Sequence, residues 1–164
     1  MVYLITFACY GCHLHGDESG SVDRKHNLSR SPLLGADPER VLAEIQRMNQ
    51  PPYGMDCRRR EAVLAAIIVR CAHRCWSLLA AHVRANHVHI VVEADALPEG
   101  IMNDLKAYAS RCLNRLELDE PGRKRWARHG STRWLKSPLS VSAAVQYVVH
   151  QQGSPMAVFE ATER

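Results

Sequence analysis

The order of helices and strands predicted from the amino-acid sequence indicates an α+β fold of the ferredoxin-like type. This is a split β-α-β arrangement with an antiparallel sheet and helices packed on one face. Segments with strand and helix periodicity follow one another as strand, helix, strand, strand, helix, strand. The chain has 164 residues, 46% hydrophobic and 23% charged, and can bury a sizeable core. We therefore predict a single domain over residues 1–164, with an additional C-terminal helix.

The N-terminal part combines one strand with a long insertion. Residues 2–10, VYLITFACY, are rich in aromatic and β-branched side chains and predict the first strand. The chain from about residue 11 to residue 57 is rich in Gly, Pro, Ser and charge. We expect an inserted loop region there, carrying one helix over residues 38–47 and a turn at QPPYG.

The remaining elements follow from periodicity and from turn or cap residues. Apolar side chains recur at helical spacing from residue 58 to residue 75, and Pro98 suits the first turn of a later helix. Gly153 marks the end of the last helix. The predicted helices cover residues 58–75, 98–118 and 139–151, and the predicted strands cover residues 76–84, 87–94 and 132–136.

Composition limits the classes of protein that fit the sequence. No run of about 18 apolar residues occurs, so we expect no membrane span. The first residues lack a basic leader and a small-residue cleavage site, and we interpret them as a strand. Six cysteines are few for this length and favour a reduced, cytoplasmic setting over a disulfide framework.

Positive charge is concentrated in one stretch of the chain. The net charge is only +4, but residues 121–138, called the basic segment below, contain six Lys or Arg and no acid. Such a cluster indicates a polyanionic partner such as DNA. A solvated basic loop with no partner is the alternative interpretation.

The motif HVHIVV places two histidines in an apolar strand. Residues two apart in a strand project to the same face, about 7 Å apart, so His87 and His89 can converge on one ion. Val88, Ile90 and Val92 then face the core. A His-x-His pair is also common as a purely structural feature, and the pattern alone leaves both interpretations open.

The helix over residues 98–118 carries the most reactive environment for a tyrosine. Tyr108 lies at the edge of its apolar stripe, beside Arg111 and Arg115. Guanidinium groups favour the phenolate and can also hold a phosphate, and an activated tyrosine is a known covalent nucleophile. The stripe itself comprises Leu105, Ala109, Cys112 and Leu116. The other four tyrosines, Tyr3, Tyr10, Tyr53 and Tyr147, are interpreted as packing residues.

Together these features resemble the HUH endonucleases, specifically the single-tyrosine transposases of insertion sequences and their relatives associated with repetitive extragenic palindromes (REPs). The resemblance runs from YLITFACYGC through HVHIVV and LKAYASRCLNR to RHGSTRWL and YVVHQQG. It implies that His87 and His89 hold a divalent cation, Mg²⁺ or Mn²⁺. It also implies that Tyr108 attacks a single-stranded DNA phosphodiester, giving a 5′-phosphotyrosine link and a free 3′-hydroxyl.

The resemblance also implies partners. These are single-stranded or hairpin DNA and a second copy of the chain, because the family acts as a homodimer that often places the tyrosine helix across from the other subunit's histidines. The residues expected to contact the DNA are Arg111, Arg115, Arg123, Lys124, Arg125, Arg128 and Arg133.

The sequence departs from the family pattern at one position, and two alternative functions remain. Several family members carry an amide side chain one turn after the tyrosine as a third metal ligand, and here that position is Cys112. Asp104, Glu93 or water is then the expected substitute. A domesticated DNA-hairpin-binding protein without cleavage activity is the first alternative. The second, less favoured, is a zinc-binding nucleic-acid module using Cys9, Cys12, His13, Cys71, His73 and Cys75.

Overall fold

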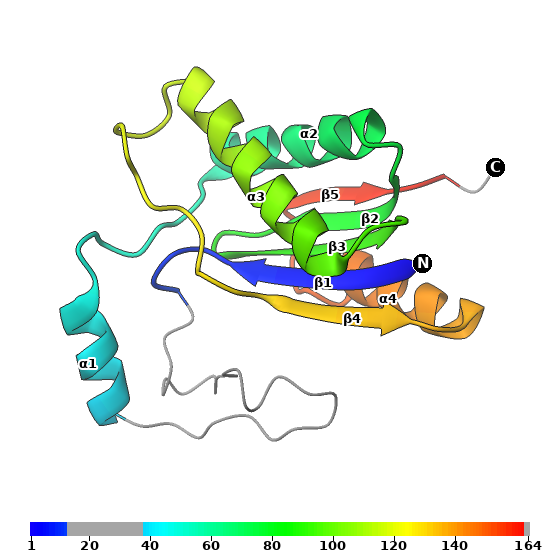
Figure 1. Cartoon of the computed structure of the whole chain (residues 1–164), viewed down its shortest axis with the longest axis horizontal. Helices are drawn as coiled ribbons and strands as arrows, with labels where there is room; N and C mark the ends of the chain where they lie inside the picture. The colour runs from blue at the N-terminus through cyan, green and yellow to red at the C-terminus, as the bar shows by residue number, and fades with distance from the viewer. Residues whose placement is uncertain (13–37, 163–164) are drawn as a thin grey trace.

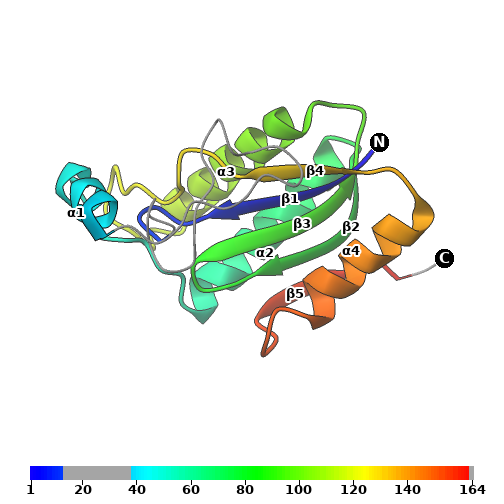
Figure 2. The ribbon, with the colours of Figure 1, turned by 90° about the horizontal axis from the view of Figure 1, so that it is seen from below.

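The computed structural model describes residues 1–12 and 38–162 and shows one antiparallel sheet with helices on both faces (Figures 1 and 2). The strand order is β4-β1-β3-β2-β5. The strands are β1 (Val2–Ala8), β2 (Ser77–Val83), β3 (His87–Glu93), β4 (Ser131–Leu135) and β5 (Ala157–Glu160). The helices are α1 (Pro38–Arg47), α2 (Cys57–His73), α3 (Pro98–Arg115) and α4 (Pro138–His150).

The first four strands with α2 and α3 form the predicted ferredoxin-like unit. Both helices cover the same face of the sheet (Figure 1). The main core lies between this face and the two helices. It includes Val88, Ile90 and Val92 of β3, as predicted, with Ile67 of α2 and Leu105 of α3. The α+β fold class is therefore confirmed.

Helix α4, which is the predicted C-terminal helix, and strand β5, which was not predicted, extend this unit. Strand β5 pairs antiparallel with β2 and forms an edge of the sheet. Helix α4 crosses the face opposite α2 and α3 (Figure 2), where Ala144 and Val148 pack on Ala80 and Val91. With α2 and α3 on one face only, His87 and His89 would project from an uncovered face of the sheet, but α4 covers part of that face.

Short-range signals in the sequence fix where α4 begins. The Ser137 hydroxyl caps the helix by accepting a hydrogen bond from the Ser140 backbone N–H, and the Ser140 hydroxyl accepts one from the Ser137 backbone N–H. Pro138 occupies the first turn, where a missing N–H costs nothing. The chain therefore leaves edge strand β4 and turns under the sheet within two residues.

The other predicted elements agree with the structure to within a few residues at each end. Helix α3 ends at Arg115, and Glu117 takes a left-handed φ of 53°. Leu116, predicted on the buried stripe, is instead 51% exposed because it lies beyond the helix. Part of the predicted insertion, residues 13–37, lies outside the described residues. No helix among those described is both long and apolar enough for a membrane span.

Candidate functional site

Strand β3 presents His87 and His89 side by side on the face that α4 partly covers. Their ring centroids are 4.7 Å apart and the rings are nearly perpendicular, at 82°. His89 is only 6% exposed, whereas His87 is half-buried at the end of the strand. The two imidazoles are therefore adjacent, and the His87 end of the pair opens toward solvent.

Each of the two histidines has an oxygen partner at its Nδ1 atom. The Thr6 Oγ1 atom on β1 lies 2.8 Å from Nδ1 of His89, and the Asn86 Oδ1 atom lies 2.6 Å from Nδ1 of His87. Burial lowers the pKa of His89 to about 4, and the neighbouring His87 and His82 add to the effect. His89 is therefore neutral near pH 7, which is the ligand form of imidazole. An oxygen partner on the other ring nitrogen is also typical of metal-binding histidines.

Helix α4 brings a tyrosine to this pair. The Tyr147 ring lies 5.6 Å from the His89 ring, centroid to centroid, at an angle of 75°. The side chain is 40% exposed, while its neighbour Val148 is fully buried against the sheet. The face of α4 that packs on the sheet thus leaves the Tyr147 ring at the rim, in contact with His89 and open to solvent.

Two amide side chains follow Tyr147 where α4 ends. Gln152 donates from Nε2 to the Tyr147 carbonyl at 3.2 Å and also hydrogen-bonds the His89 side chain. Gln151 is the helix cap, four residues after Tyr147. Tyr147, predicted from the sequence to be a packing residue, thus has an amide side chain one turn further along the chain, and Tyr108 has Cys112 at the equivalent place.

Tyr108 lies on the other side of the sheet. It is part of α3 and packs against the core between the sheet and α2. Its ring lies between two guanidinium groups, with the Cζ atoms of Arg70 and Arg111 at 5.1 Å and 5.7 Å from the ring centroid. The predicted basic environment is thus present. Within one chain, however, Tyr108 does not meet His87 and His89, because α3 and α4 cover opposite faces of the sheet.

The two carboxylates proposed as a third metal ligand are also distant from the histidines. Asp104 belongs to α3 and pairs with Arg70 at 2.7 Å and Arg74 at 2.8 Å. Glu93 shares the strand face with His89 but lies four residues further along β3, about 13 Å away. It is exposed at the end of the strand. Neither carboxylate can complete a site with the histidine pair in this chain.

The expected DNA-contacting residues separate into different environments. Arg133 is exposed on β4, and the register places it on the same face as Thr6 and His89. Arg128 is exposed as well. Arg111 and Arg115 line a pocket of about 340 Å³ with Tyr108, on the opposite face.

Arg123 and Lys124 are engaged by the segment that follows α1. The Gln50 Oε1 atom accepts from Arg123 Nη1 at 2.9 Å and from the Lys124 backbone N–H at 2.8 Å. Lys124 Nζ also donates to Asn49 Oδ1 at 2.9 Å. These two basic side chains therefore hold residues 49–51 against the basic segment, although Lys124 itself stays exposed.

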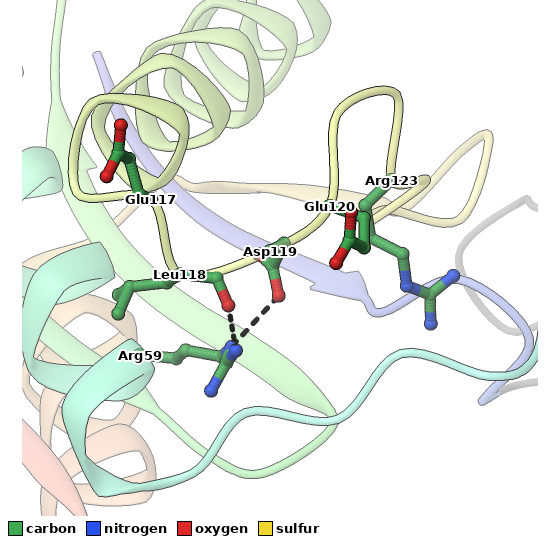
Figure 3. A pocket seen from close by; sticks show the side chains of 6 residues that line it. All are labelled: Arg59, Glu117, Leu118, Asp119, Glu120 and Arg123. Carbon is green, nitrogen blue, oxygen red and sulfur yellow. Dashed lines mark hydrogen bonds and ion pairs between the residues drawn. The ribbon is translucent and has the colours of Figure 1, made fainter.

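Arg125 is buried in an ion-pair network, contrary to its expected role at the DNA. It is 4% exposed, and its Nε atom lies 2.9 Å from Asp119 Oδ2. Asp119 also accepts from Tyr53 Oη at 2.8 Å and from Arg59 Nε at 3.0 Å. Figure 3 shows Arg59 reaching both Asp119 and the Leu118 carbonyl. Burial alone raises the pKa of Asp119, but these hydrogen bonds outweigh it and hold the pKa below its usual value.

The zinc interpretation gains no support from the part of the chain that the structure describes. Within that part, no three His, Cys, Asp or Glu side chains form a potential metal-ligand group. Cys9 and Cys71 are buried, and burial raises the pKa of each thiol to about 12, which disfavours the thiolate that Zn²⁺ requires. His13 lies outside the described residues.

Comparison with known proteins gives one informative result. No protein-family model matches the chain, and no curated protein matches it. Among solved structures, the chain is similar to a REP-associated tyrosine transposase bound to a REP hairpin, with a TM-score of 0.49 and 11% identity over 92% of this chain. This chain spans 65% of the length of the chain in that structure.

Proposed function

We propose that the chain is a metal-dependent single-stranded DNA endonuclease and strand transferase whose nucleophile is Tyr147. The observation that carries this proposal is the position of the Tyr147 ring, 5.6 Å from His89 on the same face of the sheet. A histidine pair and a half-exposed tyrosine in one site are the groups that a covalent phosphotyrosine mechanism needs. Tyr108 has no histidine pair beside it in the same chain, because its helix covers the opposite face of the sheet.

The reaction exchanges one phosphoester bond for another. The Tyr147 phenolate oxygen attacks the phosphorus of a DNA phosphodiester, and the bond between phosphorus and the 3′-oxygen breaks. The phenol releases its proton to solvent before or during attack, and the leaving 3′-oxygen takes up a proton from solvent to become a hydroxyl. The 5′-phosphotyrosine keeps the energy of the broken bond for rejoining, so no external energy source is required.

The donor set fits a divalent cation. His87 and His89 are adjacent imidazoles with oxygen partners at Nδ1, and the Gln152 amide contacts His89. Imidazole nitrogens and an amide oxygen suit Mn²⁺, and a water-completed shell suits Mg²⁺. When bound there, the cation would neutralise charge that develops on the scissile phosphate. Gln151 or Gln152 takes the place that the sequence analysis gave to Asp104 or Glu93.

The same chain supplies groups that orient DNA at this site. Arg133 is exposed on the face of the sheet that carries His87 and His89, called the histidine face below. Arg128 is exposed in the basic segment, which leads to Arg133. Guanidinium groups bind phosphate oxygens in a bidentate manner, which fixes the strand without reading its bases. We propose single-stranded or hairpin DNA as the substrate class on this charge distribution and on the motifs of the sequence.

A second candidate is a DNA-hairpin-binding protein that does not cut. It is favoured by the absence, in the described part of the chain, of a group of three His, Cys, Asp or Glu side chains around the histidine pair. Two imidazoles and a neutral amide bind a hard cation less strongly than a site that includes a carboxylate. In that case the histidine face would still bind DNA.

Incubation with labelled single-stranded DNA and Mn²⁺ or Mg²⁺, followed by a denaturing gel, tests the proposal. The wild type should give a covalent protein–DNA band, Tyr147→Phe should give none, and Tyr108→Phe should keep it. The two variants each remove one oxygen, so they are matched controls for packing. A band that survives in Tyr147→Phe would contradict the proposal. DNA binding with no band under either ion would favour the non-cutting protein.

A further inference from the structure

A third histidine on the same face takes no part in the chemistry proposed above. His82 belongs to β2, where it is the register partner of His89 on β3. It is fully buried, with no exposed surface, beneath the C-terminal part of α4. A buried polar ring is costly unless its nitrogens find partners, so those partners indicate what the residue is for.

Both ring nitrogens of His82 bind backbone groups on either side of the tyrosine–glutamine segment. Nδ1 lies 3.0 Å from the Val148 carbonyl, and Nε2 lies 3.1 Å from the Met156 backbone nitrogen. A backbone N–H only donates, so Nε2 accepts, and the neutral ring must carry its proton on Nδ1 and donate to Val148. The two bonds therefore specify one tautomer.

These two bonds fix the segment that carries the candidate site. Val148 directly follows Tyr147, and its carbonyl is among the last four of α4, which have no partner within the helix. Met156 lies at the far end of the loop that begins with Gln151 and Gln152. The ring of His82 thus joins the helix end to the point where the loop returns to the sheet.

Arg84, which directly follows β2, supports the same loop. Its Nη1 atom donates to the Ser154 carbonyl at 2.9 Å. Gly153 has a φ of +79°, a conformation that side chains other than glycine rarely adopt, which lets the loop turn back toward β2. Strand β5 then pairs with β2 itself, Val83 opposite Ala157. The loop is therefore held to β2 at several successive points.

We propose that His82 is a positioning residue that holds Tyr147 against His87 and His89 of the same chain. The proposal rests on the proposed function, because positioning has meaning only if Tyr147 is the nucleophile. An apolar residue would fill the same volume but leave the Val148 carbonyl and the Met156 N–H without partners. Misplacement of a reacting group by about 1 Å can reduce a rate about 100-fold.

Three variants separate this role from a merely structural one. His82→Leu removes both bonds, and His82→Gln offers an amide that can donate and accept. Met156→Pro removes the N–H that donates to the ring and leaves His82 itself in place, although it also fixes the backbone φ at position 156. His73→Gln is the matched control, because His73 is exposed on α2 and lies outside the site formed by His87, His89 and Tyr147. Each protein is compared with the wild type for single-turnover DNA cleavage, DNA affinity, Mn²⁺ binding by electron paramagnetic resonance, and urea unfolding.

His82→Leu should cleave about 100-fold more slowly than the wild type, with Mn²⁺ and DNA affinities within about threefold of it. His82→Gln should recover a substantial part of the rate, and His73→Gln should match the wild type. If His82→Leu does not fold, Met156→Pro carries the test and should slow cleavage while keeping both affinities.

Three results would overturn the proposal. The first is a folded His82→Leu, or failing that Met156→Pro, that cleaves at the wild-type rate. The second is a loss of Mn²⁺ binding that matches the loss of cleavage, which would make His82 part of the ion site. The third is an inactive wild type, which removes the proposed function and the positioning role with it. If the wild type cleaves DNA and a folded His82→Leu cleaves at the same rate, the positioning role is refuted but the proposed function is not.

Discussion

Removing the Asp119 carboxylate is expected to release the basic segment from the body of the domain. The Asp119 side chain is 8% exposed and that of Arg125 is 3% exposed, with 2.9 Å between Oδ2 and Nε. Removing one partner of a buried pair costs about 3–5 kcal/mol, because the other charge stays buried without compensation. Arg125 still donates to the Ser110 carbonyl and to Asn114 Oδ1. We therefore expect Asp119→Ala to lower the free energy of unfolding by about 3 kcal/mol, the low end of that range.

Urea unfolding at pH 7 measures this cost. With a slope of about 1–3 kcal/mol per molar urea, a loss of 3 kcal/mol lowers the midpoint by about 1–3 M. Glu120→Ala is the control, because Glu120 is an exposed neighbour lining the same pocket (Figure 3). A midpoint for Asp119→Ala equal to that of the control would refute the reasoning. A double mutant whose loss of unfolding free energy equals the sum of the losses for Asp119→Ala and Arg125→Met would also refute it, because a double-mutant cycle on coupled residues is not additive.

Three further predictions concern the histidine face and its surroundings. The pKa of His89 is about 4 in the folded protein and near 6.5 in the unfolded chain. As the pH falls, the unfolded chain therefore takes up a proton before the folded protein does, and the free energy of unfolding should decrease by up to about 3 kcal/mol between pH 6.5 and pH 4. Urea unfolding across that range should show a flatter profile for His89→Gln, and an unchanged profile would contradict the assignment. Gly130→Ala should lower the unfolding free energy by about 1–3 kcal/mol, since its Cβ would lie 2.5 Å from the Thr6 carbonyl oxygen; unaltered stability would argue against that contact. A mixture of Tyr147→Phe and His89→Ala chains should form no DNA adduct, whereas restored adduct would mean that chains exchange α4.

The positions of the two histidines could be predicted because a strand has a fixed period. Residues 87 and 89 must share a face whatever the strand pairs with, and the apolar residues between them must face the core. The order of strands and helices likewise restricted the topology, since crossovers between parallel strands are right-handed. That rule puts α2 and α3 on one face, as the structure has them.

The face of the sheet that α4 covers, and with it the proximity of Tyr147 to the histidines, could not be predicted without β5. Both α3 and α4 present a tyrosine at the edge of an apolar stripe, and periodicity does not say which face of the sheet each helix covers. Strand β5 runs parallel to β4 at the other edge, so α4 crosses the sheet in the direction opposite to α3. A right-handed crossover then requires the opposite face. The four residues of β5 were too short a signal to recognise.

The basic segment shows a second limit of sequence reasoning. Arg123, Lys124 and Arg125 are consecutive and look equivalent in the sequence, yet Arg125 is buried against Asp119 while Lys124 is exposed. Asp119 lies only six positions before Arg125, but its buried pairing depends on Tyr53 and Arg59, which are distant in the chain. Charge clustering therefore indicated a polyanion partner without indicating which charges reach it.

Peptide mapping of the trapped protein–DNA adduct tests the central claim most directly. The wild-type protein is incubated with single-stranded DNA and Mn²⁺, digested with protease and nuclease, and analysed by mass spectrometry for a residue that carries a nucleotide remnant. We expect the remnant on Tyr147, in the peptide that also contains Gln151 and Gln152. A remnant on Tyr108 or on any other residue would contradict the account.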